Sequence, residues 1–340
     1  MKHILVIRLS AMGDVAMAAT VLRIFSNQNP SVKITFLSKS FLQPLFTEIP
    51  NSTFHIANTN GKHKGVFGIY KLYQELKSLQ IDAIADLHNV LRSKILKVFF
   101  FGLKKATLDK GRADKKALTR AENKEFKQLK PTHERYADVF RELGYKVDLS
   151  KTNFPKPKEL TQHLKNLIRN KNPVKLIGIA PFAQYSTKTY PLDLMENVIF
   201  KLSKKQNYVV LLFGGGKEQV NILSAIENTF ANVICIAGKI TLAEELILIS
   251  NLDCMLSMDS GNAHFSAMFG VKTITIWGNT HPFAGFYPFG QSLKNALIPD
   301  LKKFPKIPTS VYGNKKVDGY EDVMRSISPE TVVHKILENL

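Results

Sequence analysis

Apolar runs and polar turns alternate in a fixed order along the first half of the chain. Residues 2–9 form an apolar run, a polar turn follows at 10–14, and an apolar helical pattern then continues to about residue 27. Strand-like runs recur at 32–38 and 81–88, and helical patterns cover 68–79 and the stretch that ends at 101. Strands that alternate with helices in this way are typical of parallel βαβ units, so the pattern predicts an α/β fold with a doubly wound sheet.

The same order starts again in the second half, where strand-like runs alternate with helical patterns from residue 175 to about 278. Two such series predict two Rossmann-like domains that face each other across a cleft, and ligands of these sheets bind in such clefts. The boundary between the domains falls between Leu149 and Pro173. We expect an N-terminal acceptor-binding domain at 1–160, a C-terminal donor domain at 161–325, and a helix at 326–340 that could pack back on the N-terminal domain.

Composition excludes several classes of protein. The chain has 340 residues, of which 44% are apolar and 22% charged, as in folded globular proteins and unlike disordered or collagen-like chains. Its two cysteines, Cys235 and Cys254, lie in apolar runs, which favours buried small side chains over a disulfide framework or a zinc site. The N-terminus has no cleavage pattern and no apolar run is long enough to span a membrane, so we expect a cytoplasmic protein that could touch the inner membrane from that side.

Charge points to an anionic partner. The chain has 47 Lys and Arg against 28 Asp and Glu, a net charge of +19, which favours a nucleic acid, a phospholipid surface, a nucleotide or a phosphorylated glycan. Residues 92–130 alone hold thirteen basic and four acidic residues, a local charge of +9. This segment is either a solvated face or an anion-binding surface beside the cleft.

Four segments that could carry chemistry each follow a predicted strand, where a doubly wound fold gathers its ligands. The first is Ser-Ala-Met-Gly-Asp-Val at 10–15. Gly13 would allow a tight turn, and Asp14 is either an acid in the first turn of a helix or a base that takes a proton from a substrate hydroxyl. The turn lacks the G-x-G-x-x-G pattern, so a dinucleotide site is a weak interpretation.

The second and third segments offer groups for a phosphorylated sugar. Ser186, Thr187 and Lys188 precede a helix that Pro191 could open, which suits a phosphate as well as an exposed turn. The third segment is Phe-Gly-Gly-Gly-Lys-Glu, in which the glycines allow close approach and Glu218 could accept hydrogen bonds from sugar hydroxyls. A tight structural turn explains it equally well.

The fourth segment joins a turn to a helix of small residues. Asp259, Ser260 and Gly261 form the turn, whose N–H groups could bind an anion, and His264 lies one helical turn further on. Helix capping by Asp259 and Ser260, with a core position for His264, is the alternative interpretation.

Together these residues resemble the heptosyltransferase family, the family-nine glycosyltransferases of lipopolysaccharide core assembly. The resemblance covers nearly the whole chain: the opening at 2–22 with its Ser-x-Met-Gly-Asp turn, Ser-Thr-Lys-Thr-Tyr-Pro at 186–191, Gly-Gly-Gly-Lys-Glu, and the ordered run at 259–280. The last run is the most specific of these. Tyr190 stands where the family has Trp, and we expect it to preserve an aromatic wall.

The resemblance implies a GT-B fold and an inverting, metal-independent transfer of heptose from ADP-heptose to an inner-core Kdo or heptose. On this sequence it implies that Asp14 is the general base and that Gly13 lies in the donor site. It also implies that Thr187 and Lys188 contact the diphosphate of the donor, that Glu218 contacts its sugar, and that the loop at Gly238 lies near its adenine. Further donor contacts are implied for Ser186, Asp259, Ser260, Gly261 and His264. No cofactor or metal is expected, and the chain has no Asp-x-Asp pair.

The basic segment matches no family motif. We expect it to bind the phosphates and carboxylates of an acidic glycolipid acceptor through Arg92, Arg112 and Arg120, with His133 nearby. Three alternatives stay open: a transferase of this fold that uses another nucleotide sugar for a surface glycan, a nonhydrolysing sugar-nucleotide epimerase, and a non-catalytic binder of anionic glycan or nucleic acid. No nucleic-acid-binding signature supports the last alternative, so no nucleic acid is expected as a partner.

Overall fold

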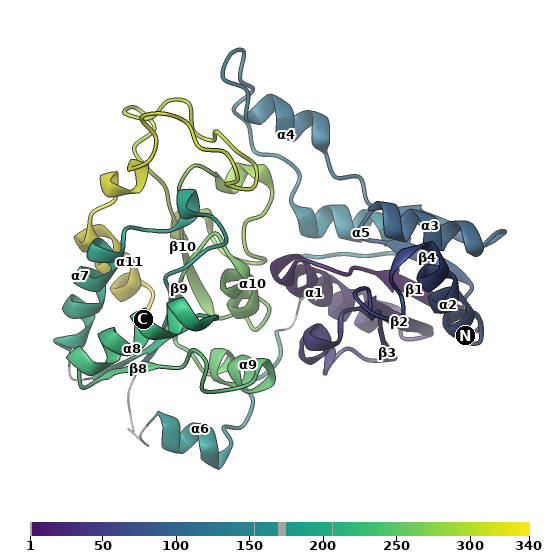
Figure 1. Cartoon of the computed structure of the whole chain (residues 1–340), viewed down its shortest axis with the longest axis horizontal. Coiled ribbons are helices and arrows are strands. Elements are labelled where there is room, and N and C mark those ends of the chain that lie inside the picture. The colour runs from purple at the N-terminus through teal and green to yellow at the C-terminus, as the bar shows by residue number, and fades with distance from the viewer. Residues whose placement is uncertain (1, 153, 169–174, 206) are drawn as a thin grey trace. The chain divides into compact units, whose positions relative to one another are not determined.

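The structure is a computed structural model of the chain and describes residues 2–152, 154–168, 175–205 and 207–340. The chain forms two compact units (Figure 1). The first comprises Met1–Arg112 and Lys130–Asn153, and the second comprises Ala113–Leu129 and Phe154–Leu340. Each unit is built around its own parallel sheet, as the repeated strand–helix order predicted.

The sheet of the first unit has the strand order β3-β2-β1-β4-β5, and every pairing is parallel. Its strands are β1 (Lys2–Ile7), β2 (Val32–Ser38), β3 (Ser52–Ile56), β4 (Ala83–Asp86) and β5 (Lys104–Thr107). Its helices are α1 (Met12–Gln28), the 3-10 segment η1 (Ser40–Phe46), α2 (Gly65–Lys77), α3 (Leu91–Phe99) and α5 (Thr132–Glu142).

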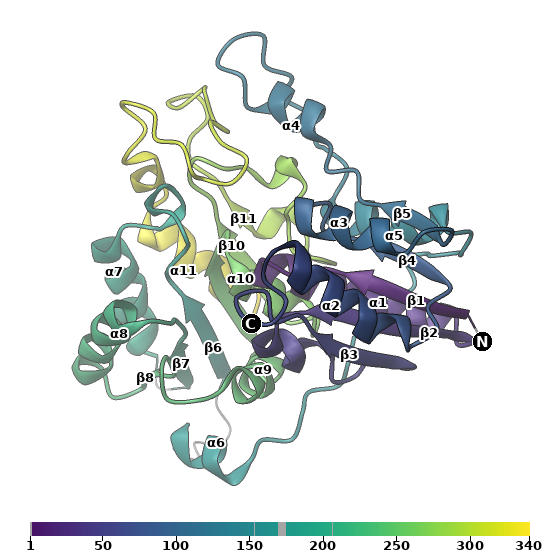
Figure 2. The ribbon, with the colours of Figure 1, turned by 45° about the vertical axis from the view of Figure 1, so that its right-hand side comes forward.

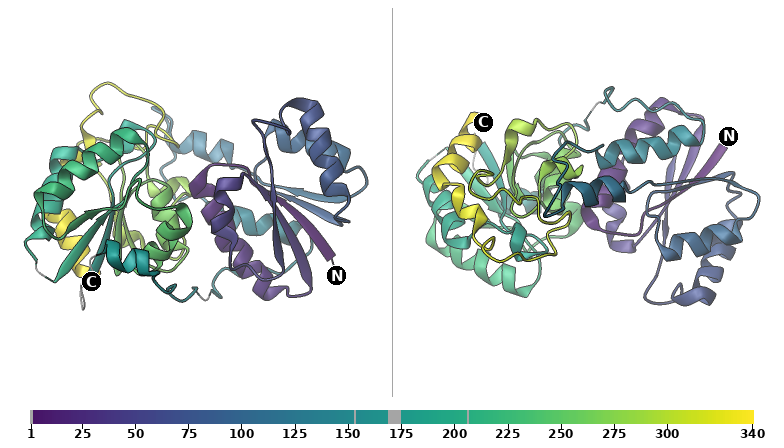
Figure 3. Two further views of the ribbon diagram at one scale, coloured as in Figure 1. Left: turned by 60° about the horizontal axis from the view of Figure 1, so that its bottom comes forward. Right: turned by 90° about the horizontal axis from the view of Figure 1, so that it is seen from above.

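Alternation along β1 divides the helices between the two faces of this sheet (Figure 3). Leu5 and Ile7 point into a cluster with Leu72 of α2 and Leu96 of α3. α1 and α5 pack together, with Phe25 stacked on Phe140 at a centroid distance of 4.4 Å. The carboxyl end of β1 thus leads directly into the turn that carries Asp14.

The sheet of the second unit has the order β11-β10-β9-β6-β7-β8 and is also parallel. Its strands are β6 (Lys175–Ala180), β7 (Tyr208–Leu212), β8 (Val233–Cys235), β9 (Cys254–Met258), β10 (Lys272–Ile276) and β11 (Ala296–Leu297). Its helices are α6 (Gln162–Leu167), α7 (Leu192–Ser203), α8 (Lys217–Thr229), α9 (Leu242–Ser250), α10 (Gly261–Ala267) and α11 (Pro329–Glu338). Short 3-10 segments are η2 (Ser186–Lys188), η3 (Pro282–Ala284), η4 (Leu293–Asn295) and η5 (Val323–Ser326).

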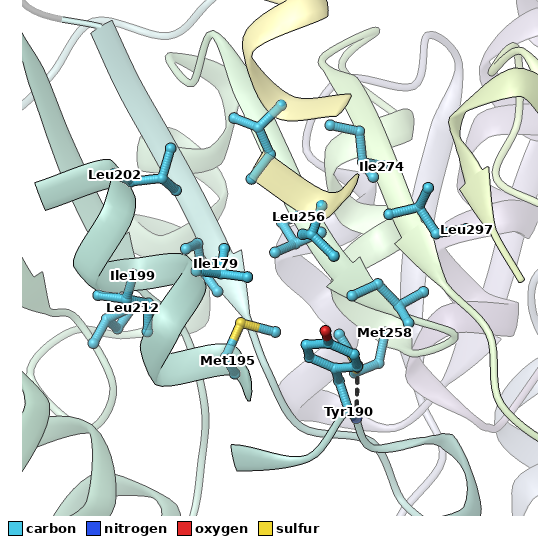
Figure 4. Packing of buried hydrophobic residues seen from close by; sticks show 14 of the residues in the cluster. Ile179, Tyr190, Met195, Ile199, Leu202, Leu212, Leu256, Met258, Ile274 and Leu297 are labelled. Atoms are coloured by element: carbon cyan, nitrogen blue, oxygen red, sulfur yellow. Dashed lines mark hydrogen bonds between the residues drawn. The ribbon is translucent and has the colours of Figure 1, made fainter. Parts of the chain in front are cut away.

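One face of this second sheet is covered by α7, α8 and α11 over a dense apolar core (Figure 4). Both cysteines are buried and free of disulfides, which confirms the expectation that they act as small apolar side chains. α11 packs on α7 because Val332 and Ile336 are fully buried in the same core, so this helix is part of the second unit.

A segment from the first half of the sequence belongs to the second unit. α4 (Arg112–Leu118) starts it, and residues 113–129 then pack on residues near 283 and 311. Leu129 N–H donates to Phe283 O at 2.9 Å, and Lys124 Nζ donates to Pro308 O at 3.0 Å. The sequence division at residue 160 did not anticipate this exchange, because its contacts join positions far apart in the chain. Residues 169–174, at the end of the expected boundary region, lie outside the described residues.

Candidate active site

Asp14 lies in the first turn of α1, just past the carboxyl end of β1. Its Oδ2 forms an ion pair with Arg8 Nη2 at 2.5 Å and accepts a hydrogen bond from Ala11 N at 3.3 Å. Its Oδ1 accepts a hydrogen bond of the same length, 3.3 Å, from the hydroxyl of Tyr136 on α5. The side chain keeps 23% of its surface exposed. Asp14 is therefore both a helix acid and a carboxylate that a substrate can reach.

Arg8 is held from two further directions. Its Nη1 donates to Leu87 O at 2.7 Å, in the loop after β4. Its guanidinium lies 5.8 Å from the ring centroid of Tyr136. Because Arg8 is nearly buried, its charge acts on Asp14 through little intervening water, which strengthens the interaction.

The loop after β4 adds a fixed set of charges beside this pair. Asp86 is fully buried and accepts hydrogen bonds from His88 N at 3.0 Å and Asn89 N at 2.8 Å, and it pairs with Lys97 at 2.8 Å. Burial, followed by the charges of Arg8 and Lys110, lowers the pKa of His88 to about 4. His88 is therefore neutral at pH 7, and its Nδ1 accepts the N–H of Leu9 at 3.4 Å.

Gly13 differs from its expected role. It lies inside α1, and it is not among the glycines with positive φ. The residue that precedes α1 is Ala11, whose backbone is extended with φ −84°. Gly13 therefore supplies no special backbone angle, although its place one residue before Asp14 keeps it beside the candidate base.

The four expected acceptor residues fall in different units. Arg92 lies in the first turn of α3, Arg112 begins α4, and His133 lies on α5, all in the first unit. Arg120 follows α4 in the second unit. Several other cations of this segment have structural partners: Lys97 pairs with Asp86, and ion pairs also join Lys127 to Glu125 and Lys130 to Asp138. The local charge of +9 is therefore only partly available to a ligand.

In the second unit, Lys188 and Asp259 come together at the carboxyl ends of β6 and β9. Lys188 Nζ donates to Asp259 O at 2.7 Å and lies 3.3 Å from Oδ2 of the same residue. Thr280, after β10, donates to that Oδ2 at 2.9 Å. Both charged side chains are about nine-tenths buried. Since an ammonium has three N–H donors, Lys188 can still offer one to a ligand.

The loop 309–314 packs over this pair. Thr187 Oγ1 donates to Gly313 O, and Asn279 N donates to Thr187 O at 3.0 Å. Gly313 has φ +80°, and a Cβ atom there would lie 2.5 Å from Cγ of Lys188. The loop thus fixes the stem of Lys188 and leaves room for no side chain at this position. Ser186, by contrast, is exposed.

The glycine-rich loop lies open. A Cβ atom at Gly215 or Gly216 would meet nothing within 4 Å, so a ligand can approach the backbone there. Glu218 is exposed on the first turn of α8. Gly238 follows β8 with φ +73°, which a residue with a side chain rarely adopts.

Ser260 and His264 occupy α10, the short helix after Asp259. Ser260 is the N-cap residue, but its hydroxyl lies 3.1 Å from Ser257 Oγ and makes no cap hydrogen bond, so the capping interpretation is wrong for Ser260. Gly261 begins the helix, and His264 is 8% exposed among buried residues. His264 therefore lies one helical turn beyond Gly261, with little of its surface exposed.

Tyr190 was expected to preserve an aromatic wall, and its ring lies in the core of the second unit. The ring is 1% exposed and lies in the apolar core (Figure 4). Its hydroxyl donates to Ile327 O at 2.6 Å. Burial raises the pKa of this phenol. The aromatic ring contributes to the packing of the second unit. The replacement of Trp by Tyr at this position is therefore not explained by contact with a site residue.

Three partners of the candidate residues were missed in the sequence. Arg8 follows an apolar strand, and a charged residue in that place was the one available signal. In the first unit Tyr136 contacts Asp14, and in the second Gly313 contacts Thr187, each from a distant segment that no local pattern marks. Within the described residues, no cluster of three or more His, Cys, Asp or Glu is arranged to hold a metal ion.

The sequence profile of glycosyltransferase family 9 (heptosyltransferase) matches residues 69–310. The chain belongs to glycosyltransferase family 9. As a member of this family it is a glycosyltransferase of the lipopolysaccharide heptosyltransferase group, as the resemblance of its motifs predicted.

Individual relatives of this family 9 enzyme are distant but span its whole length. It is 26% identical to lipooligosaccharide heptosyltransferase 2 of Haemophilus influenzae, over 99% of both chains. A family 9 glycosyl transferase from Veillonella parvula has a TM-score of 0.76 at 18% identity, covering 99% of this chain and 97% of that one. The E. coli heptosyltransferase WaaC with ADP has a TM-score of 0.66 at 16% identity, covering 99% and 100%. These likenesses confirm the GT-B type of α/β fold.

Proposed function

We propose that this family 9 enzyme transfers heptose from ADP-heptose to an inner-core lipopolysaccharide acceptor, either Kdo or heptose, with inversion and without a metal ion. The observation that carries the proposal is Asp14, a reachable carboxylate held by Arg8 at the end of β1. The donor assignment is supported by the likeness to the E. coli heptosyltransferase WaaC, whose structure is a complex with ADP. The acidic glycolipid acceptor is supported by the heptosyltransferase relatives and by the positive charge of the chain.

Asp14 acts as the general base in this proposal. The acceptor oxygen attacks the anomeric carbon, the bond from that carbon to the diphosphate oxygen breaks, and ADP leaves with the electron pair. Asp14 takes the proton of the acceptor hydroxyl. Oδ1 is the more available oxygen because the 2.5 Å ion pair occupies Oδ2. Inversion needs only one such base, placed on the face opposite the leaving group.

Lys188 acts on the leaving group. The diphosphate gains negative charge as the bond breaks, so a fixed ammonium stabilises the transition state more than the bound substrate. Asp259, which accepts a hydrogen bond from Thr280, holds the Lys188 ammonium in place, and this lowers the cost of ordering the ammonium when the donor binds. A positive charge from the protein thereby takes the role that a metal ion has in other transferases.

The remaining donor contacts are assigned by place. Thr187 and Ser186 lie beside Lys188 in η2, and Glu218 is exposed after the open glycine loop. Gly238 follows β8, the edge strand of the second sheet, where the adenine is expected. Asp259, Ser260, Gly261 and His264 complete the donor side.

Arg92, Arg112, Arg120 and His133 are proposed to bind the acceptor. The reaction is placed in the cytoplasm, at the face of the inner membrane.

A transferase of this fold with a different nucleotide sugar is the second candidate, because the geometry of Lys188 recognises a diphosphate and not a base. Calorimetric titration of the whole chain with ADP, UDP, GDP and CMP, with and without EDTA, separates the two. We expect selective ADP binding that EDTA does not change. Preference for UDP or GDP would keep the fold and exclude ADP-heptose as the donor.

The same titration tests Lys188. Lys188→Ala should weaken ADP binding on the order of ten- to a hundredfold, the usual cost of one hydrogen bond to a charged group. Lys272→Ala is the matched control, because Lys272 is exposed at the amino end of β10, the opposite end from the site. Equal affinities of the two variants would remove Lys188 from the donor site.

A further inference from the structure

The outer face of the helix pair α2 and α3 in the first unit is unusually apolar. The two helices pack side by side on the sheet (Figures 1 and 2), joined by a contact between Tyr70 and Phe99 with ring centroids 5.4 Å apart. Phe101 is 94% exposed and Phe67 is 88% exposed. Exposed apolar side chains that gather on one face mark an interaction surface, whereas single ones do not.

The exposed positions follow the helical repeat. On α2 they recur at residues 66, 67, 70, 71 and 74, and on α3 at 91, 94 and 98, followed by 101. Each helix therefore has one face in the core and one face outward. The α2–α3 face is defined by its outward apolar and basic residues, which are Val66, Phe67, Tyr70, Leu91, Val98, Phe101, Lys64, Lys71 and Lys94.

Negative charge is scarce around this face. Between residues 49 and 108 the acidic residues are Glu75, Asp82 and Asp86. Asp86 is fully buried. Glu75 is engaged by Lys62 at 2.9 Å and by two histidines, and Asp82 precedes β4, at the amino end of that strand. Aromatic side chains among uncompensated lysines fit a lipid surface with anionic headgroups.

We propose that the α2–α3 face docks the protein on an anionic lipid surface, with the aromatic rings in the interface and the lysines on the headgroups. No helix in the described parts of the chain is long and apolar enough to cross a membrane, so contact would be peripheral. α3 starts directly after the loop of Asp86 and His88, and Ser93 ties it to Asp86 at 2.8 Å. Docking would therefore hold the Asp14 end of this unit close to the lipid.

The lipid docking itself does not depend on which sugar is transferred. Its use, which is to meet a glycolipid acceptor at the membrane, rests on the proposed function. The two are tested separately, by lipid binding and by activity on a soluble acceptor without acyl chains.

The experiment is co-sedimentation of the full chain with phosphatidylcholine vesicles, with and without phosphatidylglycerol. We expect binding only when phosphatidylglycerol is present, and release at high salt. Phe67→Gln/Phe101→Gln should weaken binding about tenfold or more, because the apolar contact is lost. Lys71→Gln should weaken it about fivefold, the value of one cation near an anionic surface.

Two controls lie outside the α2–α3 face. Phe41→Gln removes an aromatic ring that is 53% exposed on η1, and Lys146→Gln removes an exposed cation after α5. Both should bind vesicles as the unaltered protein does. Equal binding of the double variant and Phe41→Gln would overturn the proposal. Vesicle binding that depends on Lys71 alone would also overturn it, because it would indicate a general polyanion surface. A dimer in size-exclusion chromatography that the double variant abolishes would overturn it as well.

Activity on the soluble acceptor distinguishes the two proposals. The double phenylalanine variant should keep turnover on it within about twofold, since neither ring touches the site residues. A variant that loses both vesicle binding and this turnover would contradict a pure docking role. An unaltered protein that binds vesicles but transfers no heptose would overturn the proposed function and leave the docking surface in place.

Discussion

At the scale of single residues, the main feature is that the candidate base is held by a cation. Arg8 pairs with one oxygen of Asp14, and Tyr136 contacts the other. A carboxylate whose orientation is already fixed needs less free energy to reach its reactive position. Misplacement by about 1 Å can lower the rate on the order of a hundredfold. Arg8 and Tyr136 are thus positioning residues for the proposed reaction.

Arg8→Gln should lower kcat roughly ten- to a hundredfold with a smaller effect on the KM of the donor. Arg8→Lys should restore part of kcat, since Lys keeps the charge but not the forked geometry. An unaltered kcat in Arg8→Gln would contradict the positioning role of Arg8.

His281 provides a pH test of stability. It is 3% exposed, and burial, followed by the charge of Lys124, lowers its pKa from 6.5 to about 4. Its Nδ1 accepts the N–H of Phe283 at 3.2 Å, so the folded state holds it neutral. Between pH 6.5 and 4 the unfolded chain binds a proton that the folded chain does not, and stability falls as the pH falls.

This effect should amount to about 2 kcal/mol at pH 5 for a group with those two pKa values. We expect His281→Asn to lose less stability than the unaltered protein when urea unfolding is compared at pH 7 and pH 5. Parallel losses in the two proteins would show that His281 does not carry this pH dependence.

At the scale of elements, the loop 309–314 decides where Lys188 lies. A Cβ atom on Gly313 would collide with the lysine stem, and the φ of this residue is +80°. Gly313→Ala should therefore weaken ADP binding about tenfold by displacing the ammonium. It should also lower the stability of the fold by roughly 1–2 kcal/mol through backbone strain. Calorimetry and thermal unfolding measure the two effects separately.

Gly319→Ala is the matched control for this strain. Gly319 has φ +78° in the same unit, and a Cβ atom there meets nothing within 4 Å. The control should lose similar stability and keep its affinity for ADP. A loss of ADP affinity in both variants would mean that strain, rather than the contact with Lys188, is responsible.

The sequence predicted the elements with strong patterns and missed those without them. Apolar runs located the central strands of both sheets, since buried parallel strands need continuous apolar residues. The edge strands β3 and β5 are short and partly polar, Ser-Thr-Phe-His-Ile and Lys-Lys-Ala-Thr, and no periodicity marks them. The position of Tyr190 could not be predicted either, because contacts from Ile327 and Met258 place it in the core.

At the scale of the whole molecule, net charge overstates the surface available to an anion. Lys97 and Lys130 pair with acidic residues, and Lys124 donates to backbone carbonyls. Motif order predicted the family and the type of fold, because the motifs follow strands whose carboxyl ends gather ligands. It could not predict that residues 113–129 join the second unit, which depends on contacts between distant segments.

This distinction gives a test of the acceptor residues. Arg92→Gln/Arg112→Gln should raise the KM of an acidic acceptor about tenfold at low salt and less at high salt, as expected for screened charges. Lys127→Gln removes a cation from the same segment that is paired with Glu125 at 3.0 Å, and it should change the KM little. Equal effects of the two changes would show that the segment acts only through its total charge.

The most direct test of the proposed reaction is the release of ADP from ADP-heptose with a soluble Kdo-terminated acceptor, compared between the unaltered protein and Asp14→Asn. We expect acceptor-dependent ADP release, a heptosylated product of inverted anomeric configuration, and a loss of kcat on the order of 10²–10⁴-fold in Asp14→Asn with ADP binding retained. Turnover of Asp14→Asn within a few-fold of the unaltered protein would reduce Asp14 to a helix acid. No transfer from ADP-heptose by the unaltered protein would contradict the proposed reaction as a whole.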